Sequence, residues 1–243
     1  MNFTLFLNSR GRTKQLERCI LAAEANTYDY KNTEFIITAD DDDVETLNFL
    51  KKINDRNTFE FKVIIGPRLK NLIKSSNNMA SIAKGKYLFV LNDDSEIQTK
   101  NWDILALEKI SKYKLDNNIK DDIIYAATED NSIDRSKEKG YSSFPIISAE
   151  SVKTLGFFMY EDFVGLGGDS SIYRVYKGVD RVLDLKEIEL DHVYHNNFIS
   201  IINSDLTAHE MRANTYNNYV DPDKFNVDNE IKKLRDFIDK NNR

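Results

Sequence analysis

The sequence predicts an α/β fold in which a mainly parallel sheet is flanked by helices. Segments with the composition of strands alternate with segments of helical periodicity over the first half of the chain, as in successive βαβ units. Residues 87–91 are apolar or aromatic at every position, which suits a strand buried on both faces. Polar and acidic residues directly follow several strands, as expected at the edge where open α/β sheets bind ligands.

Each element is predicted from local apolar spacing. Short apolar runs predict strands, and apolar residues repeated every three or four positions predict helices. We expect strands at residues 3–7, 34–39, 61–65, 86–91, 122–127 and 181–190. We expect helices at residues 12–26, 43–55, 70–84, 101–113, 149–156 and 168–178, and an amphipathic helix within 223–241. Residues 129–142 are polar, which indicates a loop, and we expect this loop to order over a bound ligand.

The composition indicates a globular protein and argues against some partners. The net charge is −6, with acids spread along the chain, so nucleic acid is not an expected partner. Cys19 is the single cysteine, which excludes an internal disulfide framework, and its apolar helix position predicts a buried structural thiol. No apolar stretch approaches the roughly 20 residues that span a bilayer. With no signal-peptide pattern at its start, the chain is expected in the cytoplasm.

Three strand ends carry side chains that could bind a nucleotide and a metal ion. Arg10 and Arg12 follow the first strand, four aspartates at 40–43 follow the second, and Asp93 and Asp94 follow the fourth. The ends of parallel strands meet at one edge of a sheet, so we expect these groups to lie close together. Carboxylates suit Mg²⁺ or Mn²⁺, which combine one or two of them with substrate phosphates, and a guanidinium can hold phosphate.

These groups also have structural interpretations that the sequence leaves open. Residues 92–94 could form a solvated turn, because Asn and Asp are common turn residues. Asp42 or Asp43 could cap the helix that follows. The two arginines could simply neutralise the acidic strand ends.

The second half of the chain offers a candidate general base and a candidate imidazole ligand. Three glycines within residues 165–168 precede Asp169, at the start of an expected helix. Glycines let backbone approach a ligand, and Asp169 could act as a general base or only as a helix cap. His192 and His195 follow strand 181–190, where alternation would place them on opposite faces. One metal ion would therefore take only one of them.

Taken in order, these segments resemble the GT-A-fold glycosyltransferases, in particular the family-2-like enzymes and their small bacterial and phage relatives. In the first half, the resemblance rests on residues 9–12, on the acidic run 40–43, and on residues 78–94, which have the pattern N-x-A…A-x-G-x before an apolar strand and two aspartates. It continues through residues 101–103, 148–156 and 161–169 to a histidine after the next strand. It covers roughly residues 1–195 in the same order and spacing, which is more specific than any single motif.

The resemblance implies a GT-A fold and a metal-dependent transfer of sugar from a nucleotide-diphosphate sugar, commonly a UDP-sugar, to a glycan or other hydroxyl acceptor. It implies a single domain over 1–243, with a nucleotide-sugar-binding half at 1–128, an acceptor and catalytic half at 129–222 and a terminal helix at 223–243.

On the donor side, the resemblance implies that Asp40 or Asp41 reads the nucleotide base. Asp93 would contact the ribose or the metal ion. Asp94 would ligate the Mn²⁺ or Mg²⁺ ion that bridges the diphosphate.

The remaining roles implied by the resemblance concern the imidazole, the base and the arginines. His192, in preference to His195, would complete the metal or diphosphate site. Asp169 would deprotonate the acceptor hydroxyl for in-line attack with inversion. Arg10 or Arg12 would help the metal ion stabilise the departing diphosphate.

Departures from the family pattern leave alternatives open. Asn92 and Ser95 flank the two aspartates, so the sequence lacks a strict D-x-D frame and either aspartate could bind the metal. Ser170 follows Asp169 where many relatives carry Glu-Asp, which leaves a different acceptor, or retention of configuration, open. The nearest enzyme alternative is a sugar-phosphate nucleotidyltransferase, but only Gly11 stands where that class has a glycine-rich loop. A non-catalytic nucleotide-sugar-binding subunit is the other alternative.

Overall fold

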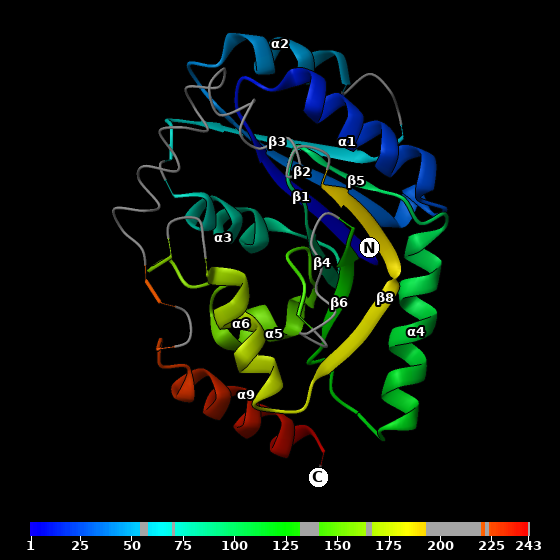
Figure 1. Cartoon of the computed structure of the whole chain (residues 1–243), viewed down its shortest axis with the longest axis vertical. Coiled ribbons are helices and arrows are strands. Elements are labelled where there is room, and N and C mark those ends of the chain that lie inside the picture. The colour runs from blue at the N-terminus through cyan, green and yellow to red at the C-terminus, as the bar shows by residue number, and fades with distance from the viewer. Residues whose placement is uncertain are drawn as a thin grey trace.

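A computed structural model of the chain describes residues 1–53, 58–69, 71–131, 141–163, 167–192, 220–221 and 224–242. Within these ranges, helices flank a sheet of eight strands in the order β3-β2-β1-β4-β7-β6-β8-β5 (Figure 1). The strands are β1 (Phe3–Ser9), β2 (Thr33–Asp40), β3 (Glu60–Gly66), β4 (Tyr87–Val90), β5 (Ser95–Ile97), β6 (Tyr125–Asp130), β7 (Ile146–Ser148) and β8 (Val182–His192). The helices are α1 (Thr13–Asn26), η1 (Tyr30–Asn32), α2 (Val44–Ile53), α3 (Leu72–Ile82), α4 (Trp102–Asp116), α5 (Ala149–Leu155), α6 (Gly168–Lys177) and α9 (Asp228–Asn241).

One part of the sheet is parallel and the other is mixed. The neighbours β3, β2, β1 and β4 are parallel, as predicted. β7 then runs antiparallel to both β4 and β6, β8 is parallel to β6, and β5 is antiparallel to β8. The sequence patterns do not predict β5 and β7, because a three-residue strand is too short to show a period.

β6 corrects the prediction for the middle of the chain. The strand runs from Tyr125 to Asp130 instead of over residues 122–127, so Glu129 and Asp130, expected in a loop, belong to the sheet. Both pair with the second half of β8, which is possible because a strand ladder uses backbone groups whatever the side chains. Residues 132–140 of the expected loop lie outside the described residues, so its ordering over a ligand stays a prediction.

β8 pairs with β6 along most of its length and with the edge strand β5 at its end. Its register with β6 shifts between Thr128 and Glu129, where β8 contains extra residues. Such a bulge bends a strand, and β8 is the long curved yellow arrow in Figure 1. Its last residues pair with β5, which places His192 opposite Ser95.

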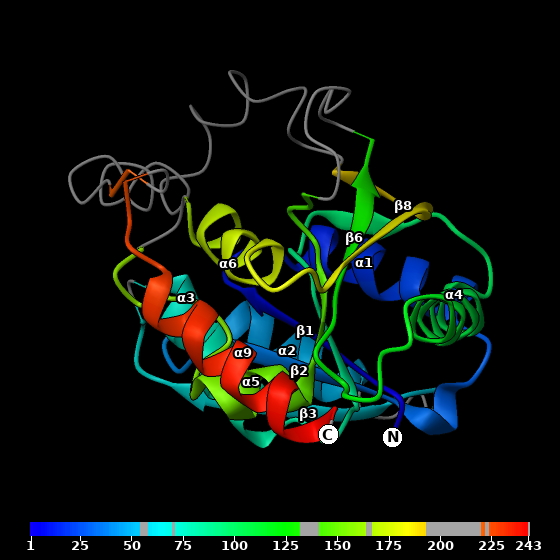
Figure 2. The ribbon, with the colours of Figure 1, turned by 90° about the horizontal axis from the view of Figure 1, so that it is seen from below.

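The core consists of two clusters, one on each face of the sheet. Alternate side chains of β1 separate accordingly, since Phe3, Leu5 and Leu7 join one cluster and Phe6 joins the other. Helices α1, α2 and α4 cover the first face, and α3, α5, α6 and α9 cover the second. Figure 2 shows α4 on the opposite side of the molecule from α3, α5 and α9. Cys19 is buried in the first cluster, as predicted.

The glycine before β4 has a structural explanation. A Cβ on Gly85 would lie 2.4 Å from the backbone nitrogen of Thr4, so a larger residue would push β4 away from β1. Its N–H donates to the Thr4 hydroxyl at 2.9 Å. That hydroxyl donates in turn to the buried carboxylate of Glu34, which pairs with Lys62 at 2.5 Å. This part of the family-like motif therefore holds the central strands together.

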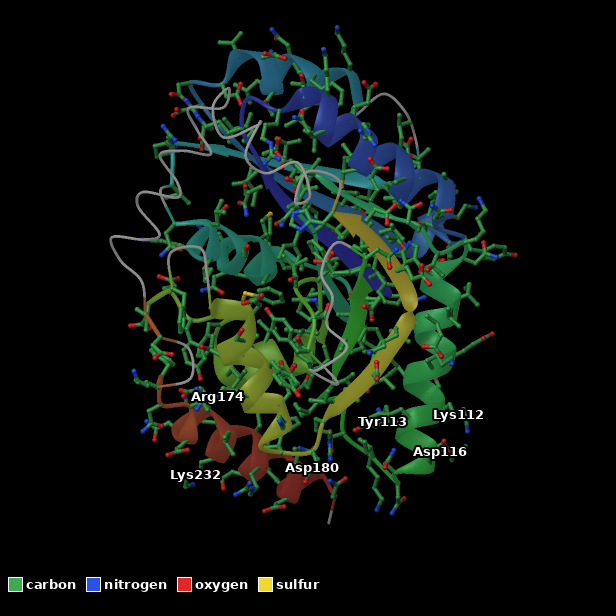
Figure 3. All side chains as sticks on the ribbon, viewed as in Figure 1. Lys112, Tyr113, Asp116, Arg174, Asp180 and Lys232 are labelled. Carbon is green, nitrogen blue, oxygen red and sulfur yellow. The ribbon has the colours of Figure 1, made fainter. Side chains whose placement is uncertain are left out.

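The C-terminal helix packs on the second face, as its amphipathic pattern predicts. Leu234 and Ile238 of α9 are buried in the second cluster. Arg174 of α6 donates from Nη1 to the backbone oxygen of Phe225 at 2.9 Å, and it lies where α6 meets α9 (Figure 3). None of the described helices is both long and apolar enough to cross a membrane.

Candidate active site

The two aspartates after β4 lie in a turn, but they are not solvated. The backbone N–H and the hydroxyl of Ser95 both donate to the backbone oxygen of Asn92, at 3.0 and 2.8 Å. Asp93 is nevertheless only 4% exposed, and the Asp94 side chain only 12%. The predicted turn is thus confirmed, but its solvation is wrong for the two aspartates. Buried carboxylates require nearby compensating charge or hydrogen-bond donors.

His192 supplies one of these partners. Its Nε2 lies 3.2 Å from Oδ1 of Asp94, because the pairing of β5 with β8 sets His192 opposite Ser95. Its Nδ1 lies 3.8 Å from Oδ2 of the buried Asp130, at the end of β6. Burial lowers the pKa of His192, but the carboxylates of Asp130 and Asp94 more than offset this and raise it to about 9. These two carboxylates therefore favour the imidazolium form of His192.

Arg12 supplies the second partner. One guanidinium nitrogen lies 2.8 Å from Asp93 and another lies 2.5 Å from Oδ2 of Asp94. The Ser9 hydroxyl donates to the other oxygen of Asp93 at 3.0 Å. Burial raises the pKa of Asp94, but His192 and Arg12 together hold it at about 2. Arg12, Asp93, Asp94, Asp130 and His192 are hereafter called the Asp94 cluster.

A second charged group, here called the Asp40 cluster, consists of Arg10, Asp40 and Asp42. Arg10 lies 2.9 Å from Asp40 and donates from Nη2 to Asp42 at 3.0 Å. Burial raises the pKa of Asp40 despite this arginine, whereas Arg10 lowers the pKa of the exposed Asp42. Asp41 is exposed beside them. Both arginines thus form ion pairs with the acidic residues at the strand ends.

Asp43 is the residue of the acidic run that caps a helix. Its carboxylate accepts the backbone N–H of Thr46 at 3.2 Å, in the first turn of α2. It also accepts the backbone N–H of Gly11 at 2.7 Å, which ties the loop after β1 to α2. This structural interpretation accounts for Asp43 and leaves Asp40 and Asp41 available to a ligand.

Asp169 lies in the first turn of α6 and is held by two uncharged donors. Its Oδ1 accepts the backbone N–H of Ser170 at 2.9 Å, and its Oδ2 accepts the hydroxyl of Tyr141. Tyr141 packs edge-to-face on Tyr173 of α6, with 5.9 Å between the ring centroids.

Two of the glycines before Asp169 serve the local fold. Gly167 has a φ of 93°, a left-handed conformation that favours glycine. A Cβ on Gly168 would lie 2.5 Å from Cδ1 of Ile73, so a glycine lets α6 pack against α3. Gly165 and His195 lie outside the described residues.

The structure thus gathers the candidate residues into three places. Arg12, Asp93, Asp94 and His192 meet in the Asp94 cluster, and Arg10 and Asp40 meet beside Asp41. Asp169 stands apart on α6, where Tyr141 links it to the segment that leads to β7.

The sequence patterns miss Asp130 and Asn77. The patterns miss Asp130 because the predicted strand ends at residue 127, although an acid at a strand end is the signal used elsewhere in the chain. Asn77 of α3 binds the segment that precedes the glycines, since its amide oxygen accepts the backbone N–H groups of Phe158 and Met159 at 2.9 and 3.0 Å. No local pattern separates Asn77 from the adjacent Asn78, with which the family-like run begins.

The geometry of Asp94 and His192 fits two neighbouring ligands of one cation. Two ligands about 2.1 Å from an octahedral ion, at right angles to each other, lie about 3.0 Å apart. The Asp94 and His192 atoms are 3.2 Å apart. Among the described residues no group of three or more His, Cys, Asp or Glu side chains is arranged to hold an ion. Substrate oxygens or water would therefore fill the other positions.

The sequence profile of the glycosyl transferase family 2 matches residues 6–161 of this chain. The chain belongs to this family. It is a glycosyltransferase, as the resemblance implied. The match covers β1 to α5 and includes both arginines and the Asp93–Asp94 pair, whereas Asp169 and His192 lie beyond it. No curated protein sequence matches this glycosyltransferase.

Solved structures place the chain in the GT-A fold. Residues 1–349 of S. aureus TarS in complex with UDP superpose with a TM-score of 0.62 and 13% identity, over 87% of this chain and 68% of that one. The mannosyltransferase PcManGT from Pyrobaculum calidifontis, in complex with GDP-Man and Mn²⁺, superposes with a TM-score of 0.61 and 10% identity, over 78% of this chain and 56% of that one. In another crystal structure of S. aureus TarS, this chain covers 43% of the TarS chain. At such identities the likeness establishes the fold alone.

Proposed function

We propose that this glycosyltransferase moves a sugar from a nucleotide-diphosphate sugar, most simply a UDP-sugar, to an acceptor hydroxyl with inversion at the anomeric carbon. The observation that carries the proposal is the contact between Asp94 and His192 at 3.2 Å, with Arg12 on the other carboxylate oxygen. This contact brings a carboxylate, an imidazole and a guanidinium together at the edge of the sheet where open α/β sheets commonly bind ligands. The structures of TarS with UDP and with UDP-GlcNAc support a uridine donor.

We assign Asp94 and His192 as the ligands of a divalent cation, Mn²⁺ or Mg²⁺. When bound there, the cation would neutralise the charge that grows on the diphosphate as the sugar–phosphate bond breaks. Mg²⁺ strongly prefers oxygen ligands, so the imidazole favours Mn²⁺. Oδ2 of Asp130 lies 3.8 Å from the second ring nitrogen of His192, where its charge would help to orient the imidazole, in the place that a carboxylate commonly takes beside a histidine ligand.

The other charged residues would hold the nucleotide. Asp40 or Asp41, at the end of β2, would accept a hydrogen bond from the base, and Asp93 would accept one from the ribose. Arg10 and Arg12 would turn some of their donors to the diphosphate, because a guanidinium has five N–H groups and binds phosphate well.

Asp169 would act as the general base. The proton of the acceptor hydroxyl moves to Asp169, the hydroxyl oxygen forms a bond to the anomeric carbon, and the bond from that carbon to the diphosphate breaks with its electron pair leaving on the diphosphate. Attack in line with the departing group inverts the configuration. The uncharged donors Tyr141 and Ser170 orient this carboxylate without neutralising it.

The first test is binding of UDP with and without Mn²⁺, followed by a panel of nucleotide sugars assayed for nucleotide release. Asp94→Asn should abolish Mn²⁺-dependent UDP binding, whereas Asp184→Asn, an exposed aspartate on β8, should leave it unchanged. Equal UDP binding by Asp94→Asn and the wild type would refute the metal assignment. The anomeric configuration of the product, read by NMR, tests inversion.

A further inference from the structure

The segment of residues 141–144 contacts both ends of the proposed reaction site. Tyr141 donates its hydroxyl to Asp169, and the Phe144 ring packs edge-on against the His192 ring at 5.3 Å between centroids. Three residues of extended chain span at most about 11 Å. One short stretch of backbone therefore connects the candidate base to the candidate metal ligand.

Buried side chains of β6 hold this segment in place. The Tyr125 hydroxyl donates to the backbone oxygen of Ser142 at 3.2 Å and accepts its N–H at 3.2 Å. The Thr128 hydroxyl donates to the backbone oxygen of Phe144 at 2.6 Å. β6 also carries Asp130, which faces His192. The same strand therefore contacts both this segment and the imidazole of His192.

Packing also fixes the Tyr141 ring. Its edge-to-face contact with Tyr173 continues to the fully buried Tyr125, whose ring centroid is 5.7 Å from that of Tyr173. The hydroxyl of Tyr141 therefore reaches Asp169 from a set direction. An ionised carboxylate has about four acceptor positions, so the donors Tyr141 and Ser170 leave Asp169 able to take a proton.

We infer that Tyr141 is a positioning residue that orients the carboxylate of Asp169 for the acceptor, and that residues 141–144 set the spacing between this base and His192. The inference rests on the proposed function, because it needs Asp169 as the base. Orientation has a large effect on rate, since a misplacement of about 1 Å can cost roughly a hundredfold.

The test compares Tyr141→Phe with Tyr113→Phe. Tyr113 of α4 donates its hydroxyl to the backbone oxygen of Asp180 at 3.3 Å, so its phenylalanine variant loses a tyrosine hydroxyl that is bonded to an uncharged acceptor near the end of α4 (Figure 3). Tyr141→Phe should lower kcat for transfer about tenfold or more, the value of one hydrogen bond to a charged group. Its donor KM and its Mn²⁺-dependent affinity for UDP should not change, and a larger share of the donor should be lost to water. Tyr113→Phe should change none of these quantities.

A second variant, Phe144→Leu, tests the other end of the segment. It keeps a buried apolar side chain but removes the ring that packs on His192, so Mn²⁺-dependent UDP affinity should fall while the share of donor lost to water stays at the wild-type value.

A wild-type kcat in Tyr141→Phe, or a loss of kcat equal to that of Tyr113→Phe, overturns the inference while the proposed function stands. If the wild-type chain releases no nucleotide from any donor of the panel, the proposed function fails and the inference fails with it.

Discussion

Asp94, after β4, lies between a guanidinium and an imidazole, whereas Asp169, at the start of α6, lies between a phenol and a backbone amide. In the Asp94 cluster, buried charges compensate one another, so each member needs the others. Around Asp169, uncharged donors set the direction of a carboxylate. The pKa of Asp94, about 2, suits an anion that must never take a proton. The contrast matches a ligand on one side and a proton acceptor on the other.

The largest expected effect separates the two regions by function. Asp169→Asn should lower kcat for transfer by roughly 10²–10⁴-fold, the usual contribution of a general base, because an amide cannot take the proton. Mn²⁺-dependent UDP binding should be retained, since Asp169 lies outside the Asp94 cluster. Initial rates and calorimetric UDP titrations measure the two quantities. Turnover near the wild-type rate would show that the reaction does not use this base.

The second prediction separates the regions by stability. Arg12→Met removes the guanidinium that the buried carboxylates of Asp93 and Asp94 share, so the free energy of unfolding should fall by about 3 kcal/mol in urea titrations. Arg18→Met is the matched control, because Arg18 pairs with Glu96 at 2.6 Å but is half-exposed, and exposed pairs contribute about 0–1 kcal/mol. Equal losses in the two variants would mean that burial of the Asp94 cluster has no energetic consequence.

The third prediction concerns the carboxylate behind the imidazole. Asp130→Asn should weaken Mn²⁺-dependent UDP binding by about 10–100-fold, as is usual when a partner that orients a metal ligand is lost. The loss should appear in binding titrations and not only in turnover. An unchanged affinity would remove Asp130 from the metal site.

The last prediction concerns pH, and its expected effect is about tenfold for each pH unit. Mn²⁺ must displace the proton of His192, whose pKa is about 9, so the affinity for Mn²⁺ alone should rise about tenfold per pH unit between about 6 and 8. The same shift upward from the ordinary value of 6.5 stabilises the metal-free fold fully below about pH 6.5, and this stabilisation is lost as the pH rises through 9. Mn²⁺ titrations followed by electron paramagnetic resonance measure the slope, and His192→Gln should flatten it. A slope that survives this substitution would assign the proton to another group.

Local patterns in the sequence predict most of the fold that surrounds the site. The buried strand before Asp93 and the helices that cover the sheet are found from apolar spacing alone, because that spacing reports which face of one continuous segment is buried. The patterns also place Asp94 and Asp169 just after a strand and at a helix start, respectively, where function was expected.

By itself the sequence determined most of the strands and helices, the polar strand ends and the family, since these follow from local spacing and from the order of motifs along the chain. Only the tertiary structure decided that the bulged β8 carries His192 to Asp94, that Asp130 stands behind it, and that Asp43 is the cap in the acidic run. These are choices among partners about 60 to 100 residues apart, or among adjacent identical residues. Packing of the whole chain selects such partners, and the local spacing of apolar residues does not predict them.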